Sequence, residues 1–301
     1  MIAIAVVVQY IELQKFTADH FTVESEKVRT SFRLVVFADL HGHAFGKNNS
    51  RLIEQTKKAR PDYILTAGDM ITAKETGRYG EVLDFMIRLR EIAPVYYGMG
   101  NHEGRVKMPE SSCYEDYLEY EAGLKAEGIH VLDNEKAEIS NSSESESCTS
   151  SESESGSTAG EDTVLLYGLT LPVSCYEKRE PVPLSEEYIV EQLGRGEPEK
   201  FQILLAHSPA YCEQYAKWGS DLTFCGHNHG GLIRIPGVGS VFSPQFEWFP
   251  KYDRGHYLLQ GKDSAEKKHV IVSAGLGTHT FHIRIFNRAQ LLVVDVCPKR
   301  R

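Results

Sequence analysis

The feature that most constrains this chain of 301 residues is a short apolar run that ends in an acid and a histidine. Residues 33–38 have the pattern of a buried β-strand, and Asp39 and His41 follow directly. Ligands bind at the carboxyl ends of the strands in open α/β sheets, and carboxylates and imidazoles are ligands of divalent cations. The stretch therefore predicts a metal site at a strand end. A strand followed by an ordinary polar turn is the alternative that this motif alone leaves open.

Helices and strands alternate after this first strand. Apolar periodicity predicts helices at 49–59 and 79–92, and strands at 62–67 and 95–99. The second strand ends at Asp69, 30 residues after Asp39. The third ends at Asn101, 32 residues further on, with His102 and Glu103 next. Each separation fits one strand–helix unit of a parallel sheet, so we expect these polar side chains at one edge.

Two strands in the second half also end in histidines. The predicted strand over 201–205 leads to His207, and the one over 221–225 leads to His227 and His229. Further strands are predicted in the tail at 232–235, 270–273, 283–286 and 291–294. We expect an α/β fold with a four-layer α-β-β-α sandwich of two mixed sheets flanked by helices, in a single domain.

Composition sets the expected boundaries. Residues 1–30 are predicted to form an N-terminal leader and an edge strand, and residues 31–301 the domain. The apolar run over residues 1–8 is shorter than the roughly 20 residues of a membrane-spanning helix, and no signal peptide is evident. A truncated membrane anchor stays open. Residues 141–162 are rich in Ser and Glu, which predicts a disordered insert.

Net charge and cysteine content indicate which binding partners and which thiol state to expect. A net charge of −9 disfavours a nucleic-acid partner held by a broad basic surface. The six cysteines show no Cys-x-x-Cys pair, and we expect free thiols. The expected location is cytoplasmic or peripherally membrane-associated, and the sequence does not predict the oligomeric state.

The strand-end residues together form a set of metal ligands. The set has two carboxylates, one carboxamide and four imidazoles, namely Asp39, His41, Asp69, Asn101, His207, His227 and His229. These are too many for one ion that also holds water. They suit two ions about 3.5–4 Å apart that share a carboxylate, an arrangement that clamps a phosphoryl group.

These blocks resemble the five-block signature of the calcineurin-like metallophosphoesterase superfamily over about residues 33–231, and 230–236 and 275–277 resemble its bacterial YkuE-like subgroup. The resemblance implies two divalent metal ions, Mn²⁺, Fe or Zn²⁺. It also implies that Asp39, His41 and His229 hold one ion. Asn101, His207 and His227 would hold the other, and Asp69 would bridge the two.

The resemblance further implies hydrolysis of a phosphoester by a metal-bridging hydroxide. His102 would protonate the leaving group, while Asn101 would stabilise charge on the phosphoryl oxygens. Glu103 is interpreted as a helix-start carboxylate or a support for the ligands. His43 and His279 either face the substrate or are loop histidines.

The substrate class stays broad: a phosphodiester, a phosphomonoester or a pyrophosphate-linked small molecule or lipid head group. After Asp69 the chain continues as Met70 and Ile71, which differs from the sequence that follows Gly-Asp in the serine/threonine protein phosphatases of this superfamily. A nuclease of the same superfamily and a non-catalytic binding module are the alternatives. Phe246, Trp248 and Phe249 are interpreted as a lip over the site that contacts a membrane surface, or as a packed loop.

Overall fold

The computed structural model describes residues 9–73, 78–141, 162–177, 182–243, 247–262, 267–278 and 282–299. The first sheet has six strands in the order β1-β14-β2-β3-β4-β5. Their bounds are β1 Phe16–Ser25, β14 Ala289–Pro298, β2 Phe32–Phe37, β3 Tyr63–Ala67, β4 Val95–Gly98 and β5 His130–Leu132. Strands β2 to β5 are parallel, and β14 runs antiparallel to β2. The expected edge strand before the core is β1, which lies parallel to β14.

The second sheet also has six strands, in the order β12-β13-β9-β8-β7-β6. Their bounds are β12 Gly255–Gln260, β13 Lys267–Val272, β9 Leu222–Cys225, β8 Phe201–Ala206, β7 Asp162–Leu169 and β6 Glu135–Asn141. A separate two-stranded sheet pairs β10 (Ile233–Ile235) with β11 (Gly239–Phe242). Both large sheets are mixed, as expected.

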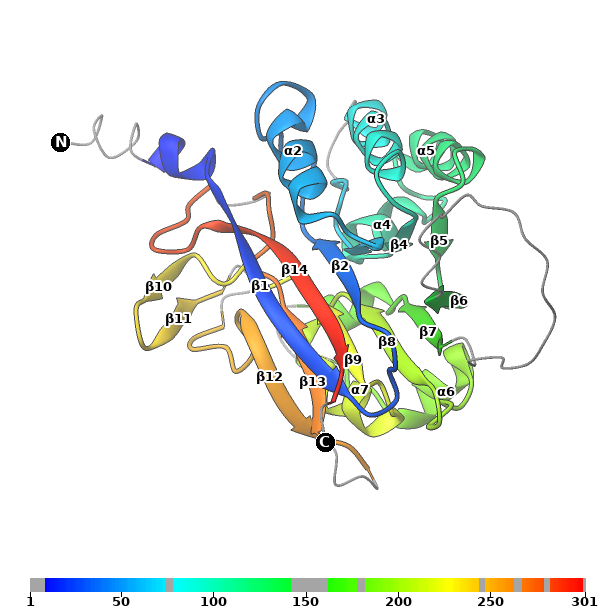
Figure 1. Cartoon of the computed structure of the whole chain (residues 1–301). Helices are drawn as coiled ribbons and strands as arrows, with labels where there is room; N and C mark the ends of the chain where they lie inside the picture. Colours follow the sequence, from blue (N-terminus) through cyan, green and yellow to red (C-terminus); the bar gives the residue numbers. More distant parts are fainter. Residues whose placement is uncertain are drawn as a thin grey trace, which may run out of the picture.

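Helices cover the outer face of each sheet (Figure 1). Helices α2 (Ser50–Ala59), α3 (Tyr79–Arg90) and α5 (Tyr114–Ala126) lie on the first sheet, and α6 (Glu186–Leu193) and α7 (Cys212–Trp218) on the second. The short helix α4 (Asn101–Val106) follows β4 directly.

Alternation along the strands produces the layers. In β2, Val35 and Phe37 pack in a core with the helices, whereas Leu34 and Val36 pack in a second core with the other sheet. A third core lies between the second sheet and its helices. Successive side chains of a strand point to opposite faces, so a continuous apolar run fills two cores at once. The predicted four-layer sandwich is confirmed.

Some predictions of secondary structure were wrong or incomplete. Residues 283–286 are not a strand, because only Ile285 forms an isolated bridge, to Ile233. Helices α4 and α6 and strands β11 and β12 were not predicted from the sequence. Five cysteines are free thiols, as expected: Cys113, Cys175, Cys212, Cys225 and Cys297. Among the described residues, no helix combines the length and the hydropathy needed to span a bilayer.

Several predictions fall outside the described residues. They concern the apolar residues 1–8, most of the Ser/Glu-rich stretch (142–161), Phe246 and His279.

The two strands beside the Ser/Glu-rich stretch generate a prediction. Strands β6 and β7 are antiparallel, and Asn141 lies opposite Asp162. Replacing residues 142–161 with Asn-Gly, the preferred two-residue hairpin turn, should therefore keep the fold. We expect the free energy of unfolding to be unchanged or to rise by up to about 2 kcal/mol, because a shorter loop costs less closure entropy.

Thermal unfolding monitored by circular dichroism checks this prediction. A Gly/Ser segment of equal length serves as the control, because it separates the effect of loop length from that of loop sequence. A marked loss of melting temperature in both variants would mean that the native stretch packs on the domain.

Candidate metal centre

The predicted ligands converge where the carboxyl ends of strands from both sheets meet. Asp39 and His41 follow β2, Asp69 follows β3, and Asn101 begins α4 after β4. From the second sheet, His207 follows β8, and the loop after β9 carries His227 and His229. All the predicted metal ligands except His227 are buried, and His227 is half-buried.

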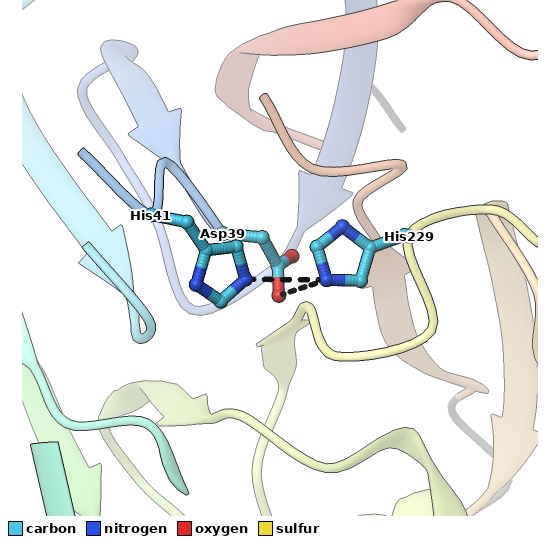
Figure 2. A group of neighbouring side chains, drawn as sticks. All are labelled: Asp39, His41 and His229. Carbon is cyan, nitrogen blue, oxygen red and sulfur yellow. Dashed lines mark hydrogen bonds and ion pairs between the residues drawn. The ribbon is translucent and has the colours of Figure 1, made fainter. Parts of the chain in front are cut away.

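The first group of potential ligands is Asp39, His41 and His229 (Figure 2). The Nε2 atoms of His41 and His229 lie 3.2 Å apart, and Asp39 Oδ1 lies 3.6 Å from His229 Nε2. His229 Nδ1 lies 3.1 Å from the carbonyl oxygen of Gly277, to which it donates as the Nδ1–H tautomer. That tautomer leaves the Nε2 lone pair facing the other two side chains.

The second group is Asp69, His207 and His227. Asp69 Oδ2 lies 3.1 Å from His207 Nε2, while His207 Nδ1 faces the carbonyl oxygen of Ala67 at 2.6 Å. The side-chain amide of Asn101 adjoins this group, because its nitrogen lies 2.8 Å from His227 Nδ1 when it is oriented to donate there.

Asp69 lies between the two groups. Its Oδ2 atom is 3.9 Å from the Nε2 atoms of both His41 and His102, and these three residues form a third possible ligand group. Its Oδ1 atom accepts a hydrogen bond from the backbone N–H of His102 (2.8 Å). One carboxylate is thus within reach of side chains from both sheets.

Burial shapes the electrostatics of the centre. It raises the pKa of Asp39 to about 7, against the opposing effect of His207. Burial alone would also raise the pKa of Asp69, but His207 and His102 outweigh it and hold that pKa well below its ordinary value. Burial alone would lower the pKa of His207, yet Asp69 raises it to about 10. The buried negative charge thus calls for a positive partner, a role open to protonated His207 or to a metal ion.

The ligand loops have a left-handed backbone. Five of the predicted ligand residues have φ between 50° and 69°: Asp39, His41, Asp69, His227 and His229. This conformation is uncommon for residues other than glycine and costs about 1–2 kcal/mol each. Surrounding contacts must therefore hold these turns in place.

Glu103 holds the turn after β3. Its buried carboxylate accepts hydrogen bonds from four backbone N–H groups and one phenol: Asp69 (2.9 Å), Met70 (2.9 Å), Ile71 (3.3 Å), Gly100 (3.0 Å) and the hydroxyl of Tyr97 (2.7 Å). Glu103 thereby fixes Asp69 and the start of α4 together. The geometry matches the helix-start interpretation made from the sequence.

Arg284 and Asn287 hold the turn that carries His229. The buried guanidinium of Arg284 donates to the carbonyl oxygens of Gly277 (2.8 Å) and Ala274 (2.9 Å). Asn287 Nδ2 donates to the carbonyl oxygens of His229 (2.7 Å) and Gly231 (2.6 Å). Sequence reasoning missed both residues. The Ile-Arg-Ile triplet at 283–285 gave no usable signal, because an arginine between two isoleucines is normally expected to face solvent.

The other predicted histidines differ in position. The Nδ1 atom of His102 accepts a hydrogen bond from the backbone N–H of Ala73 (2.7 Å). The neutral ring therefore carries its proton on Nε2, the nitrogen nearer to Asp69. His43 is half-buried against Phe45 and belongs to none of the three ligand groups found among the described residues.

The chain is similar to several known proteins. It is 24% identical over 267 residues to the Escherichia coli protein named phosphodiesterase YaeI, covering 88% of this chain and 82% of that protein. It is 22% identical over 296 residues to the Bacillus subtilis metallophosphoesterase YkuE, covering 95% and 87%. The expected likeness to YkuE is confirmed.

A solved structure of a 5′-nucleotidase precursor from Thermus thermophilus aligns with a TM-score of 0.48 at 18% identity. The alignment covers 82% of this chain, which spans 50% of that structure's length. A sequence model of the calcineurin-like phosphoesterase family matches residues 32–231. Since this match covers more than half of the sequence and includes every strand-end block described above, the chain belongs to the calcineurin-like phosphoesterase family.

Proposed function

We propose that the protein is a phosphoester hydrolase that uses two divalent metal ions, with Asp69 shared between them. One ion would be held by Asp39, His41 and His229, and the other by Asn101, His207 and His227. The observation that carries this proposal is the pair of ligand groups, one on each side of a single buried carboxylate. Every residue in the proposed set lies at a strand end within one centre.

The side chains fit such ions on three counts. Asp39 Oδ2 is buried and has no hydrogen-bond partner among the described residues, so it has lone pairs to offer. The Nδ1 contacts of His207 and His229 aim their Nε2 atoms at carboxylates. A mixed set of imidazole and carboxylate ligands suits Mn²⁺, Fe or Zn²⁺.

The side-chain amide of Asn101 supplies a further argument. Hydrogen bonding alone favours its amide nitrogen toward His227, with the oxygen accepting from Arg105 (3.1 Å). A cation at this position would instead favour the amide oxygen beside His227 Nδ1, because two acceptors 2.8 Å apart can share one ion. The amide orientation is thus expected to reverse when metal binds.

Two bound ions supply the polarisation that activates water and stabilises negative charge on the phosphoryl oxygens. The chain supplies the rest. Its Asp and His side chains fix the positions of the ions, and the amide of Asn101 lies beside them as a neutral polar group. His102 Nε2 lies 3.9 Å from Asp69 Oδ2, and in its imidazolium form His102 would donate the Nε2 proton to the departing alkoxide and become neutral.

The proposed substrates are phosphodiesters, phosphomonoesters and pyrophosphate-linked molecules. The name of the Escherichia coli relative favours a phosphodiester. The buried ligand set, with every position occupied by a ligand-type side chain, favours catalysis over a binding module that keeps only the fold.

Metal stoichiometry tests the proposal directly. Protein purified without chelator and supplied with Mn²⁺ should contain about two equivalents by elemental analysis. Asp69→Asn should lower both the metal content and the hydrolysis of bis-p-nitrophenyl phosphate, because both ions lose a charged ligand. The matched control is Asp62→Asn, which lies just before β3 and outside the centre. A stable content of one equivalent in the unmodified protein would contradict the two-ion arrangement.

The role of His102 is tested separately. His102→Ala should retain both metals and lower turnover by about 10²–10⁴ for a poor leaving group, because such a group needs a proton. The loss should shrink when p-nitrophenolate leaves, since that anion departs without protonation. His130→Ala, an exposed histidine on β5, serves as the control. Loss of metal in His102→Ala would instead identify His102 as a ligand.

Glu103→Gln tests the support of the Asp69 turn. The substitution keeps size but places an amide NH₂ among five hydrogen-bond donors. We expect metal affinity to fall about 10–100-fold, as for other residues that orient metal ligands. Glu121→Gln on α5, also buried, is the control. Unchanged Mn²⁺ affinity in a competition titration would show that the turn holds without this carboxylate.

A further inference from the structure

Short segments beside the metal centre join into one hydrogen-bonded surface, which we call the outer ribbon: residues 232–235, 239–242, 248–249 and 283–286. Ile285 bridges to Ile233, Ile233 pairs with Phe242, and Phe242 bridges to Trp248. Directly paired residues point to the same face of a sheet. The outer ribbon therefore carries a row of four apolar side chains across its width.

Polar and apolar side chains alternate along the outer ribbon in the opposite sense to an ordinary surface sheet, with the apolar side chains facing outward. In Ile233-Arg234-Ile235 the isoleucines are 40% and 48% exposed, while Arg234 points inward and pairs with Asp253 at 2.5 Å. A soluble antiparallel sheet normally places its apolar residues inside and its polar residues outside.

The same inversion recurs at residues 283–285. Ile283 and Ile285 are 42% and 39% exposed, whereas Arg284 between them is buried. Two neighbouring segments thus turn aliphatic side chains to the outside and cations to the inside. Such a surface is expected to contact another apolar phase rather than water alone.

Large aromatic side chains are also exposed on the segments of the outer ribbon. Trp248 and Phe286 are 68% and 77% exposed, and Phe249 is also exposed. Trp248 packs against Phe242 with ring centroids 5.0 Å apart. Aromatic side chains with an apolar body, Trp above all, are enriched where a protein meets the boundary between lipid and water.

The N-terminal part of the chain reaches the same face. Gln9 Nε2 lies 3.5 Å from the carbonyl oxygen of Arg284, and a groove of about 730 Å³ is lined by Gln9 and Glu12 together with Ile285 and Phe286. Tyr10 and Ile11 are exposed beside it. The eight residues before Gln9 are Met-Ile-Ala-Ile-Ala-Val-Val-Val. The first described residues therefore lie beside this apolar surface, at the left in Figure 1, and the sequence that precedes them is apolar.

The inner face of the outer ribbon connects it to the metal centre. Arg284 donates to the Gly277 carbonyl that faces His229 Nδ1, and Arg234 donates to the carbonyl oxygen of Gly230 (3.3 Å). A partner bound to the outer face would thus lie beside the turn that carries His229.

We propose that the outer ribbon docks the protein on a lipid surface. The contact is apolar, because the only charged residues among the described residues of the outer ribbon, Arg234 and Arg284, point inward. At the rim, Arg288 pairs with Glu12 and Lys251 with Glu213. Docking does not depend on the proposed hydrolysis, since it is measured without turnover.

Vesicle flotation tests this proposal on the full chain with its metals. The protein should float with phosphatidylcholine vesicles, and binding should be nearly equal at about 0.1 M and about 0.5 M NaCl, because an apolar contact is not screened. Ile233→Thr combined with Ile285→Thr keeps β-branched residues and should lower the partition coefficient about tenfold or more. Leu258→Thr on β12, also exposed, is the matched control and should bind like the unmodified protein.

Trp248 provides a second readout. The chain has two tryptophans, and Trp218 is buried, so Trp218→Phe leaves Trp248 as the reporter. Its emission should shift to the blue with vesicles and should be quenched by brominated lipid. Trp248→Phe should abolish both effects.

Four outcomes would overturn the proposal. These are failure of the folded protein to bind phosphatidylcholine vesicles, equal binding by the double Thr variant, binding that needs anionic lipid and disappears in salt, and a lipid-free dimer that the double Thr variant dissociates. The last outcome would assign the face to a second copy of the chain. Unchanged melting temperatures in the variants show that any loss of binding comes from the surface.

Discussion

The burial of two carboxylates between two sheets is the constraint on which the rest of this structure depends. Asp39 and Asp69 are almost completely removed from water, each at the end of a central parallel strand. Uncompensated burial of two such charges would be costly. Histidines from the second sheet compensate the buried charge. His207 contacts Asp69, and the backbone N–H of His227 donates to Asp39 Oδ1 (2.9 Å). The two sheets are therefore joined at this edge by electrostatics as well as by the apolar core behind it.

Close packing leaves little room around the carboxylates. A Cβ atom on Gly100 would lie 2.2 Å from Asp69 Oδ1, and one on Gly226 would lie 2.6 Å from Asp39 Oδ2. The glycines of the Gly-Asn and Gly-His blocks are thus required by the approach of the backbone to the acids. The strained turns are held from two sides, by Glu103 beneath Asp69 and by Arg284 with Asn287 beneath His229. Precise ligand positions follow from these remote supports.

The convergence of the strand-end acids and histidines could be predicted because both the fold and the chemistry leave local signals. Residues 33–38 and 62–67 are apolar on both faces, and an acid follows each. A buried strand and the acid at its carboxyl end can therefore both be predicted from a few neighbouring residues. The prediction of a strand at 283–286 was wrong. Apolar and charged residues alternate there as in a strand, but the isoleucines face outward, the arginine faces inward, and only an isolated bridge to a neighbouring strand forms. The support by Arg284 was not predictable, because its acceptors are backbone carbonyls, and carbonyls carry no sequence signal. The edge strand β12 was missed because its residues are mostly half-exposed and its alternation is weak.

Strand β14 lies between β1 and β2, although it is the last element of the chain and they are the first two strands. It pairs along all ten residues of β1, from Phe16 opposite Ala289 to Ser25 opposite Pro298. During synthesis, β1 and the outer edge of β2 therefore have no native neighbour until β14 leaves the ribosome. Contacts between such distant residues form slowly because a long loop must close first. Completion of the first sheet, and with it the final position of Asp39 at the end of β2, therefore follows the synthesis of β14.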